Sequence, residues 1–80
     1  MKMNKFDKEK RLIMCNYISK RVRELRKSRG WSQEKLGQMM GSSVPSISRI
    51  ERGNRLPSMI TIMKLAEAFN VPISEISGEL

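Results

Sequence analysis

The side chains of this sequence that could do chemistry are mostly cations. There are sixteen Lys and Arg residues against eight Asp and Glu, which gives a net charge of +8, and there is no histidine. The single cysteine, Cys15, has no histidine to activate it and no second cysteine to pair with. One Cys without any His cannot assemble a typical zinc site. We therefore expect no enzymatic activity, no metal and no cofactor, and we expect binding to a polyanion instead.

The cations are concentrated in the N-terminal part of the chain. Residues 1–29 have a net charge of +8, residues 30–55 of +2, and residues 56–80 of −2. This asymmetry predicts one surface for a polyanion and another for a different partner. Charge alone does not distinguish DNA from RNA or from an anionic membrane. No apolar run approaches the ~18 residues of a membrane span, and residues 12–15 are too short a run for a signal peptide, so we expect a cytoplasmic protein with no membrane partner.

The elements that must position these cations are helices. Ile18, Val22 and Leu25 recur at helical spacing, and Gly30 ends this pattern, so a first helix is predicted from about residue 16. Residues 1–15 are interpreted as a basic N-terminal arm or as an extension of that helix.

Four more helices follow, and each begins and ends at a typical signal. Ser32 and Ser43 are predicted N-caps for helices over residues 33–40 and 44–52, and Pro57-Ser58 opens a helix that runs to Phe69. A short last helix ends near Gly78. No stretch alternates with a period of two, so residues 16–80 are predicted to form a compact, all-α, five-helix domain.

The second and third helices have the spacing of a helix-turn-helix. Gly41 can supply the positive φ that the tight turn requires, and Gly37 provides a small residue where the two helices should approach closely. The apolar residues that would close the wedge between these helices are Leu36, Met40, Ile47 and Ile50.

A longer pattern resembles a known family. It runs Gln33-x-x-Leu36-Gly37-x-x-x-Gly41-x-x-x-x-x-Ile47-Ser48-x-Ile50-Glu51-x-Gly53, followed by Pro57-Ser58 and Leu65-Ala66. The pattern is similar to that of the Xre/Cro-type helix-turn-helix transcriptional regulators, which include the lambdoid phage repressors. The resemblance covers about residues 16–77. It implies a homodimer that binds double-stranded DNA at inverted-repeat operators, with the third helix in the major groove.

The resemblance and the helical spacing indicate the same DNA-facing side of the third helix. The residues expected to face the bases are Ser43, Val44, Pro45, Ser48 and Arg49. Arg49 is the strongest candidate base reader, because a guanidinium can bridge O6 and N7 of guanine. Pro45 stands where the family often has a polar base reader, so fewer base contacts are expected there. The residues expected to bind phosphates are Gln33, Arg52, Asn54 and Arg55.

Two further expectations concern structure and assembly. The resemblance implies a structural ion pair between Glu51 and Arg26. The acidic C-terminal part is predicted to form the dimer interface, because its apolar residues exceed what so thin a core can bury. The residues assigned to that interface are Ile60, Val71, Ile73 and Ile76.

The preferred function is a stand-alone transcriptional regulator, most simply a repressor. A restriction–modification controller protein is a close alternative, since such proteins share this size and fold. A third possibility is an antitoxin that mainly binds a toxin protein and regulates its own gene. A membrane-surface peptide built on the basic first helix is disfavoured, because Ile18, Val22 and Leu25 are needed for the core.

Overall fold

The chain folds into five helices with short connections. The computed structural model describes residues 4–78, and this part contains no β-strand. The helices are α1 (Lys5–Ser28), α2 (Gln33–Met40), α3 (Val44–Arg52), α4 (Met59–Phe69) and α5 (Ser74–Ser77). The all-α, five-helix prediction is therefore confirmed. Within residues 4–78, no helix combines the length and the apolarity needed to cross a membrane.

Local capping sets the ends of these helices, as the sequence predicted. The side chains of Ser32, Ser43 and Ser58 each accept a hydrogen bond from the backbone N–H three residues later. These bonds satisfy donors that have no partner inside the helix. At the other end of α4, Asn70 takes the left-handed conformation with φ of 56° and stops the helix.

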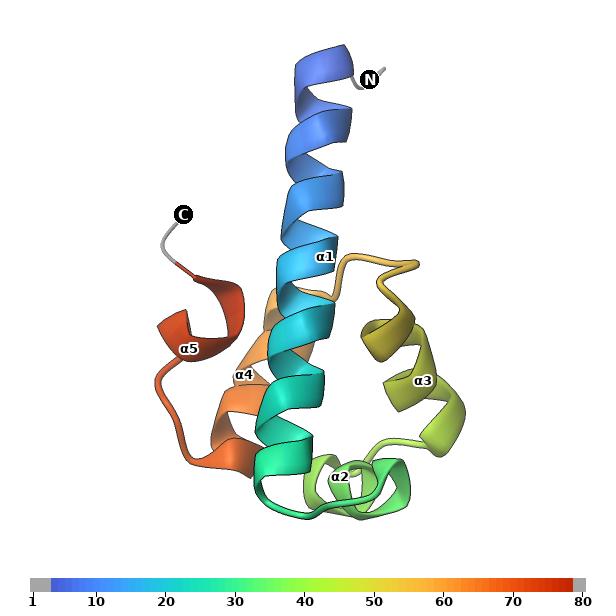
Figure 1. Cartoon of the computed structure of the whole chain (residues 1–80), viewed down its shortest axis with the longest axis vertical. Helices are drawn as coiled ribbons and strands as arrows, with labels where there is room; N and C mark the ends of the chain where they lie inside the picture. The colour runs from blue at the N-terminus through green and yellow to red at the C-terminus, as the bar shows by residue number, and fades with distance from the viewer. Residues whose placement is uncertain (1–3, 79–80) are drawn as a thin grey trace.

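Helix α1 is longer than the core alone requires. It begins at Lys5, and the Asn4 side chain caps it by accepting a hydrogen bond from the backbone N–H of Asp7. In Figure 1 its N-terminal part rises beyond the other helices. Residues 5–15 are therefore an extension of the first helix rather than an arm, whereas residues 1–3 lie outside the described part of the chain.

The core lies where α1 crosses in front of α4, with α3 on one side and α5 on the other (Figure 1). The largest fully buried side chains come from all five helices: Ile18, Val22, Leu36, Ile47, Leu65, Phe69 and Ile76. Burying such a side chain stabilises the fold by about 1.5–3 kcal/mol relative to leaving it in water. Since α1 packs against α3, α4 and α5, it is the element around which the others are placed.

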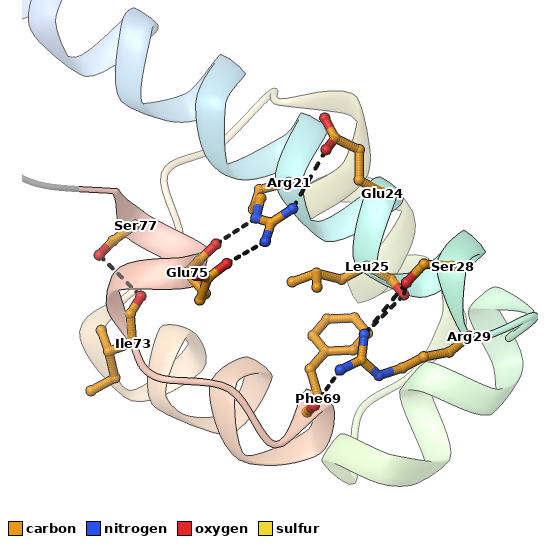
Figure 2. Close-up of polar contacts among 9 residues, drawn as sticks. All are labelled: Arg21, Glu24, Leu25, Ser28, Arg29, Phe69, Ile73, Glu75 and Ser77. Carbon is orange, nitrogen blue, oxygen red and sulfur yellow. Dashed lines mark hydrogen bonds and ion pairs between the residues drawn. The ribbon is translucent and has the colours of Figure 1, made fainter.

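The position of α5 corrects one expectation. Arg21 in α1 donates to the backbone oxygen of Glu75 at 2.8 Å and also contacts the Glu75 carboxylate (Figure 2). The side-chain hydrogen bond to the Glu75 carboxylate raises the pKa of Arg21 above its usual value. The contact holds α5 against α1, and Ile76 is fully buried beneath it. Ile76 therefore belongs to the core of the monomer, and its assignment to a dimer interface was wrong.

Candidate nucleic-acid interface

The turn between α2 and α3 depends on two glycines. Gly41 ends α2 with φ of 68°, in the left-handed region that favours glycine. Gly37 lies directly under the turn, where a Cβ would stand only 2.6 Å from the backbone oxygen of Ser42. The Ser42 N–H also donates to the Gly37 oxygen at 2.8 Å. The close approach that Gly37 permits is thus to the backbone of the turn, rather than to the facing helix as expected.

This turn presents one side of α3 to solvent. Ile47 is fully buried and Ile50 is half-buried, and together they hold the inner side of α3 on the core. On the outer side, Val44, Pro45 and Arg49 are exposed. The periodicity of a helix predicts this division, because positions 44, 45, 48 and 49 project away from 47 and 50.

The two serines among the predicted base readers differ in their environment. Ser43 is exposed, but its hydroxyl is occupied as the N-cap of α3 and lies 3.0 Å from the Ser46 hydroxyl. Ser48 is half-buried on the flank of α3. Of the five predicted base readers, Val44, Pro45 and Arg49 are therefore the most accessible.

A buried glutamate joins three helices behind this surface. Glu51 of α3 is only 4% exposed, and its carboxylate accepts hydrogen bonds from Arg26 Nε at 2.6 Å and Nη2 at 3.0 Å. The same guanidinium donates to the backbone oxygen of Trp31 at 2.9 Å. The carboxylate raises the pKa of Arg26 above its usual value, although desolvation acts in the opposite direction. Such a two-pronged pair fixes the orientation of α3 on α1.

Gln33, the predicted phosphate ligand at the start of α2, belongs to the same network. Its side-chain amide donates to Glu51 at 3.3 Å, and the residue remains partly exposed. The structure therefore brings the start of α2 and the end of α3 together through one carboxylate. A role that sequence reasoning missed is that of Arg23, which donates to the backbone oxygen of Glu51 at 3.1 Å. Arg23 lies one helical turn before Arg26 on α1, and this spacing could have indicated that both side chains reach Glu51.

Three predicted phosphate ligands lie at the end of α3 and in the loop that follows it. Arg52, Asn54 and Arg55 are all exposed. Arg49 and Arg55 line the same open hollow of about 360 Å³ between α3 and the start of α4. Its other lining residues are Ser42, Ser46, Ile50, Leu56, Pro57, Ser58 and Thr61. Two cations beside several hydroxyl groups can bind anionic oxygens. Residues 4–78 contain no group of three or more potential metal ligands.

The other residues predicted to form the dimer interface lie on α4 and near α5. Ile60 is 67% exposed and Ile73 is 41% exposed, whereas Val71 is only partly exposed and packs on the core. Figure 2 shows the Ile73 side chain pointing away from the contact between Arg21 and Glu75. Met63, one turn after Ile60 on α4, is 52% exposed and was not predicted. We call Ile60, Met63 and Ile73 the C-terminal apolar surface.

A family comparison agrees with this geometry. The family model described as helix-turn-helix, HTH_3, matches residues 22–76. The chain belongs to the helix-turn-helix family of Xre-type transcriptional regulators. Among the curated members of that family, the HTH-type transcriptional regulator YazB of Bacillus subtilis is 40% identical to this chain over 58 residues. The aligned segment covers 72% of this chain and 84% of YazB. This chain is 41% identical over 59 residues to the competence pilus inhibition repressor of Acinetobacter baylyi, covering 74% of this chain and 54% of the repressor.

Solved structures of other helix-turn-helix proteins have the same fold. An HTH_3 family transcriptional regulator from Vibrio cholerae superposes with a TM-score of 0.78 at 30% identity, over 82% of this chain and 37% of that one. The restriction-modification controller protein C.AhdI from Aeromonas hydrophila superposes with a TM-score of 0.74 at 35% identity, over 78% of this chain and 94% of its own. The helix-turn-helix match begins at residue 22, so the N-terminal extension of α1 lies outside it.

Proposed function

We propose that this helix-turn-helix regulator is a repressor that binds an inverted-repeat DNA operator as a homodimer. The observation that carries the proposal is the exposed outer side of α3, which presents Arg49 to solvent while Glu51 ties the inner side to α1 and α2. A rigidly held helix that exposes a long cation on its outer side is what readout in a major groove requires. The similarity to a curated repressor supports the direction of regulation.

Each residue of the interface has a role in this proposal. Arg49 reads a guanine, and Val44 or Pro45 packs on a thymine methyl group. The hydroxyls of Ser43 and Ser48 bond to a base edge or to a phosphate. The residues that hold the DNA backbone are Gln33, Arg52, Asn54 and Arg55. Because these contacts neutralise phosphates, affinity falls steeply as salt is raised.

Replacing Arg49 tests the base-reading role. We expect Arg49→Ala to weaken binding to the selected operator by roughly 1–3 kcal/mol and to relax preference at one base pair. Arg52→Ala is the matched control, because it removes the same charge one helical turn later and should weaken every duplex alike. The measurement is selection of bound sequences from a random pool, followed by titration of the consensus. If Arg49→Ala selects the wild-type consensus, Arg49 does not read a base.

Dimerisation is proposed through the C-terminal apolar surface together with Val71. Ile60 and Ile73 place apolar area in water on the acidic part of the chain, to which this proposal assigns no DNA contact. A two-fold axis there would place two copies of α3 about 34–36 Å apart, one turn of the DNA helix.

A double substitution tests this interface. We expect Ile60→Asp with Ile73→Asp to convert a dimer into a folded monomer, because both side chains are exposed in the monomer and an ionised carboxylate is costly to bury unpaired in an interface. Sedimentation equilibrium measures the mass, and circular dichroism checks the fold. A wild type that remains monomeric at high micromolar concentration and on its operator contradicts the proposal.

The similarity to C.AhdI favours a second candidate, control of restriction–modification genes. Both functions use the same DNA-binding surface and differ in the regulated genes. Recovery of genomic fragments bound by the protein separates them. Operators beside methyltransferase and endonuclease genes favour the controller, and operators beside other genes favour the repressor.

A further inference from the structure

One side of α1 faces the end of α3 and the connection from α3 to α4. Arg23 on this side donates to the backbone oxygen of Glu51 at 3.1 Å. One helical turn earlier, a Cβ placed on Gly53 would lie 3.2 Å from the Ser19 hydroxyl oxygen and 3.5 Å from the side-chain oxygen of Asn16. These contacts define which side of α1 is turned towards the DNA-binding elements.

The N-terminal extension of α1 continues this side beyond the domain. The line runs over residues 5, 8, 12, 16, 19 and 23 in steps of three or four, so all six fall within about 80° of one another around the helix. Lys5 and Lys8 are exposed, and Leu12 is 60% exposed, so no other element of residues 4–78 covers this side of the extension. In Figure 1 the connection from α3 to α4 lies beside the middle of α1, and the extension rises beyond it.

The connection beside this line is cationic. The segment 52–58 contains Arg52 and Arg55 and no carboxylate. Arg52, Asn54 and Arg55 are the residues proposed above to hold DNA phosphates, and all three are exposed. The two lysines of the extension therefore prolong a positive surface that already belongs to the proposed DNA interface.

Nothing within the domain accounts for these two lysines. No ion pair joins Lys5 or Lys8 to a carboxylate within residues 4–78. Glu9 lies at the edge of this side, about 60° around the helix from Leu12. Cations in the first turn of a helix are unfavourable, since the helix dipole already places positive charge there. The ammonium groups of Lys5 and Lys8 are thus available to an anion from outside the domain.

We propose that Lys5 and Lys8 bind the DNA backbone next to the phosphates held by the α3–α4 connection. The inference rests on the DNA binding proposed above and adds a contact outside the helix-turn-helix match, which begins at residue 22. Lys8 and Lys5 lie about 12 and 16 Å along the helix axis from Asn16. That length corresponds to about four base pairs of DNA. Because phosphate contacts carry no sequence information, the extension increases affinity without changing the preferred operator.

Removing one lysine charge tests the contact. We expect Lys8→Gln to reduce the slope of log K against log salt by about 0.9 and to weaken operator binding roughly fivefold to tenfold at ~0.1 M salt, because one phosphate contact is lost. Lys5→Gln with Lys8→Gln should about double the change in slope. Titration of the selected operator at several salt concentrations provides both quantities.

Lys10→Gln is the matched control. It removes the same charge two residues later, at an exposed position about 160° around the helix from Lys8, and should leave the slope unchanged. Both variants have the same net charge, so a difference between them reports a local contact. Equal slopes for Lys8→Gln and Lys10→Gln overturn the proposal.

Two further measurements distinguish this contact from operator recognition. Selection from a random pool should give Lys8→Gln the wild-type consensus, and an altered consensus overturns the backbone contact. Hydroxyl-radical footprinting should show that the double variant loses protection beside each half-site and keeps it within the half-site. A wild type that binds every duplex alike contradicts operator recognition, and the comparison of slopes on any one duplex then still decides whether α1 contacts DNA.

Discussion

Gly37→Ala is expected to destabilise the domain by roughly 1–3 kcal/mol, despite the better helix propensity of alanine. The new Cβ would lie 2.6 Å from the backbone oxygen of Ser42, a contact that side chains do not make. Relief requires the turn to move, because a backbone oxygen cannot rotate away, and the hydrogen bond from the Ser42 N–H would lengthen. For a domain of this size, each kcal/mol lowers Tm by about 4–8 °C. Thermal unfolding followed by circular dichroism measures the effect.

The same displacement should weaken operator binding, because α3 is carried by that turn. Gly41→Asn is the matched control, because it replaces the other glycine on which the same turn depends. It has open space around a new Cβ, and asparagine accepts the left-handed conformation, as Asn70 does at the end of α4. We expect Gly41→Asn to remain close to wild type in both Tm and affinity. A Gly37→Ala protein that melts at or above the wild-type temperature would show that the contact does not fix the turn.

Glu51→Gln is expected to produce a loss of similar or greater size, roughly 2–4 kcal/mol. Removing one partner of a fully buried ion pair costs about 3–5 kcal/mol, and the partial exposure of Arg26 reduces that figure. The substituted amide keeps the shape of the side chain but removes the charge. It also places an NH2 group against donors from Arg26 or Gln33, which leaves at least one of them unpaired.

Chemical denaturation of Glu51→Gln gives the free energy of unfolding, and Glu67→Gln serves as the control because Glu67 is exposed on α4. The double variant Arg26→Met with Glu51→Met should be more stable than Glu51→Gln alone, since no buried charge is left without its partner. Equal stability of Glu51→Gln and the wild type would mean that the ion pair contributes nothing to folding.

The sequence was most informative where structure depends on neighbouring residues. The serine caps, the positive φ of Gly41 and the alternation of buried Ile47 with exposed Arg49 all follow from interactions within a few residues, and each was predicted. The extension of α1 to Lys5 was left open, because its apolar residues Phe6, Leu12 and Ile13 are exposed and do not continue the pattern of the core.

Predictions that depended on contacts between distant segments were less complete. Ile76 was assigned to an interface because α5 is short, but Arg21 of α1 fixes α5 so that Ile76 is buried. Gln33 was predicted only to bind a DNA phosphate, yet its side-chain amide donates to Glu51, eighteen residues away in the sequence. The base and phosphate roles remain predictions, because they depend on the DNA itself.

The unusual length of α1 has a consequence for local opening of the fold. The amides near Ile18 and Val22 lie in the centre of the core, so they should exchange with solvent only when the whole domain unfolds. The turns near Phe6 and Lys10 have only their own helical hydrogen bonds and the Asn4 cap, and a short helix on its own is marginal in water. Those turns should fray rapidly from the N-terminal end. One unbroken helix should therefore contain both the slowest-exchanging and the fastest-exchanging backbone amides of the five helices.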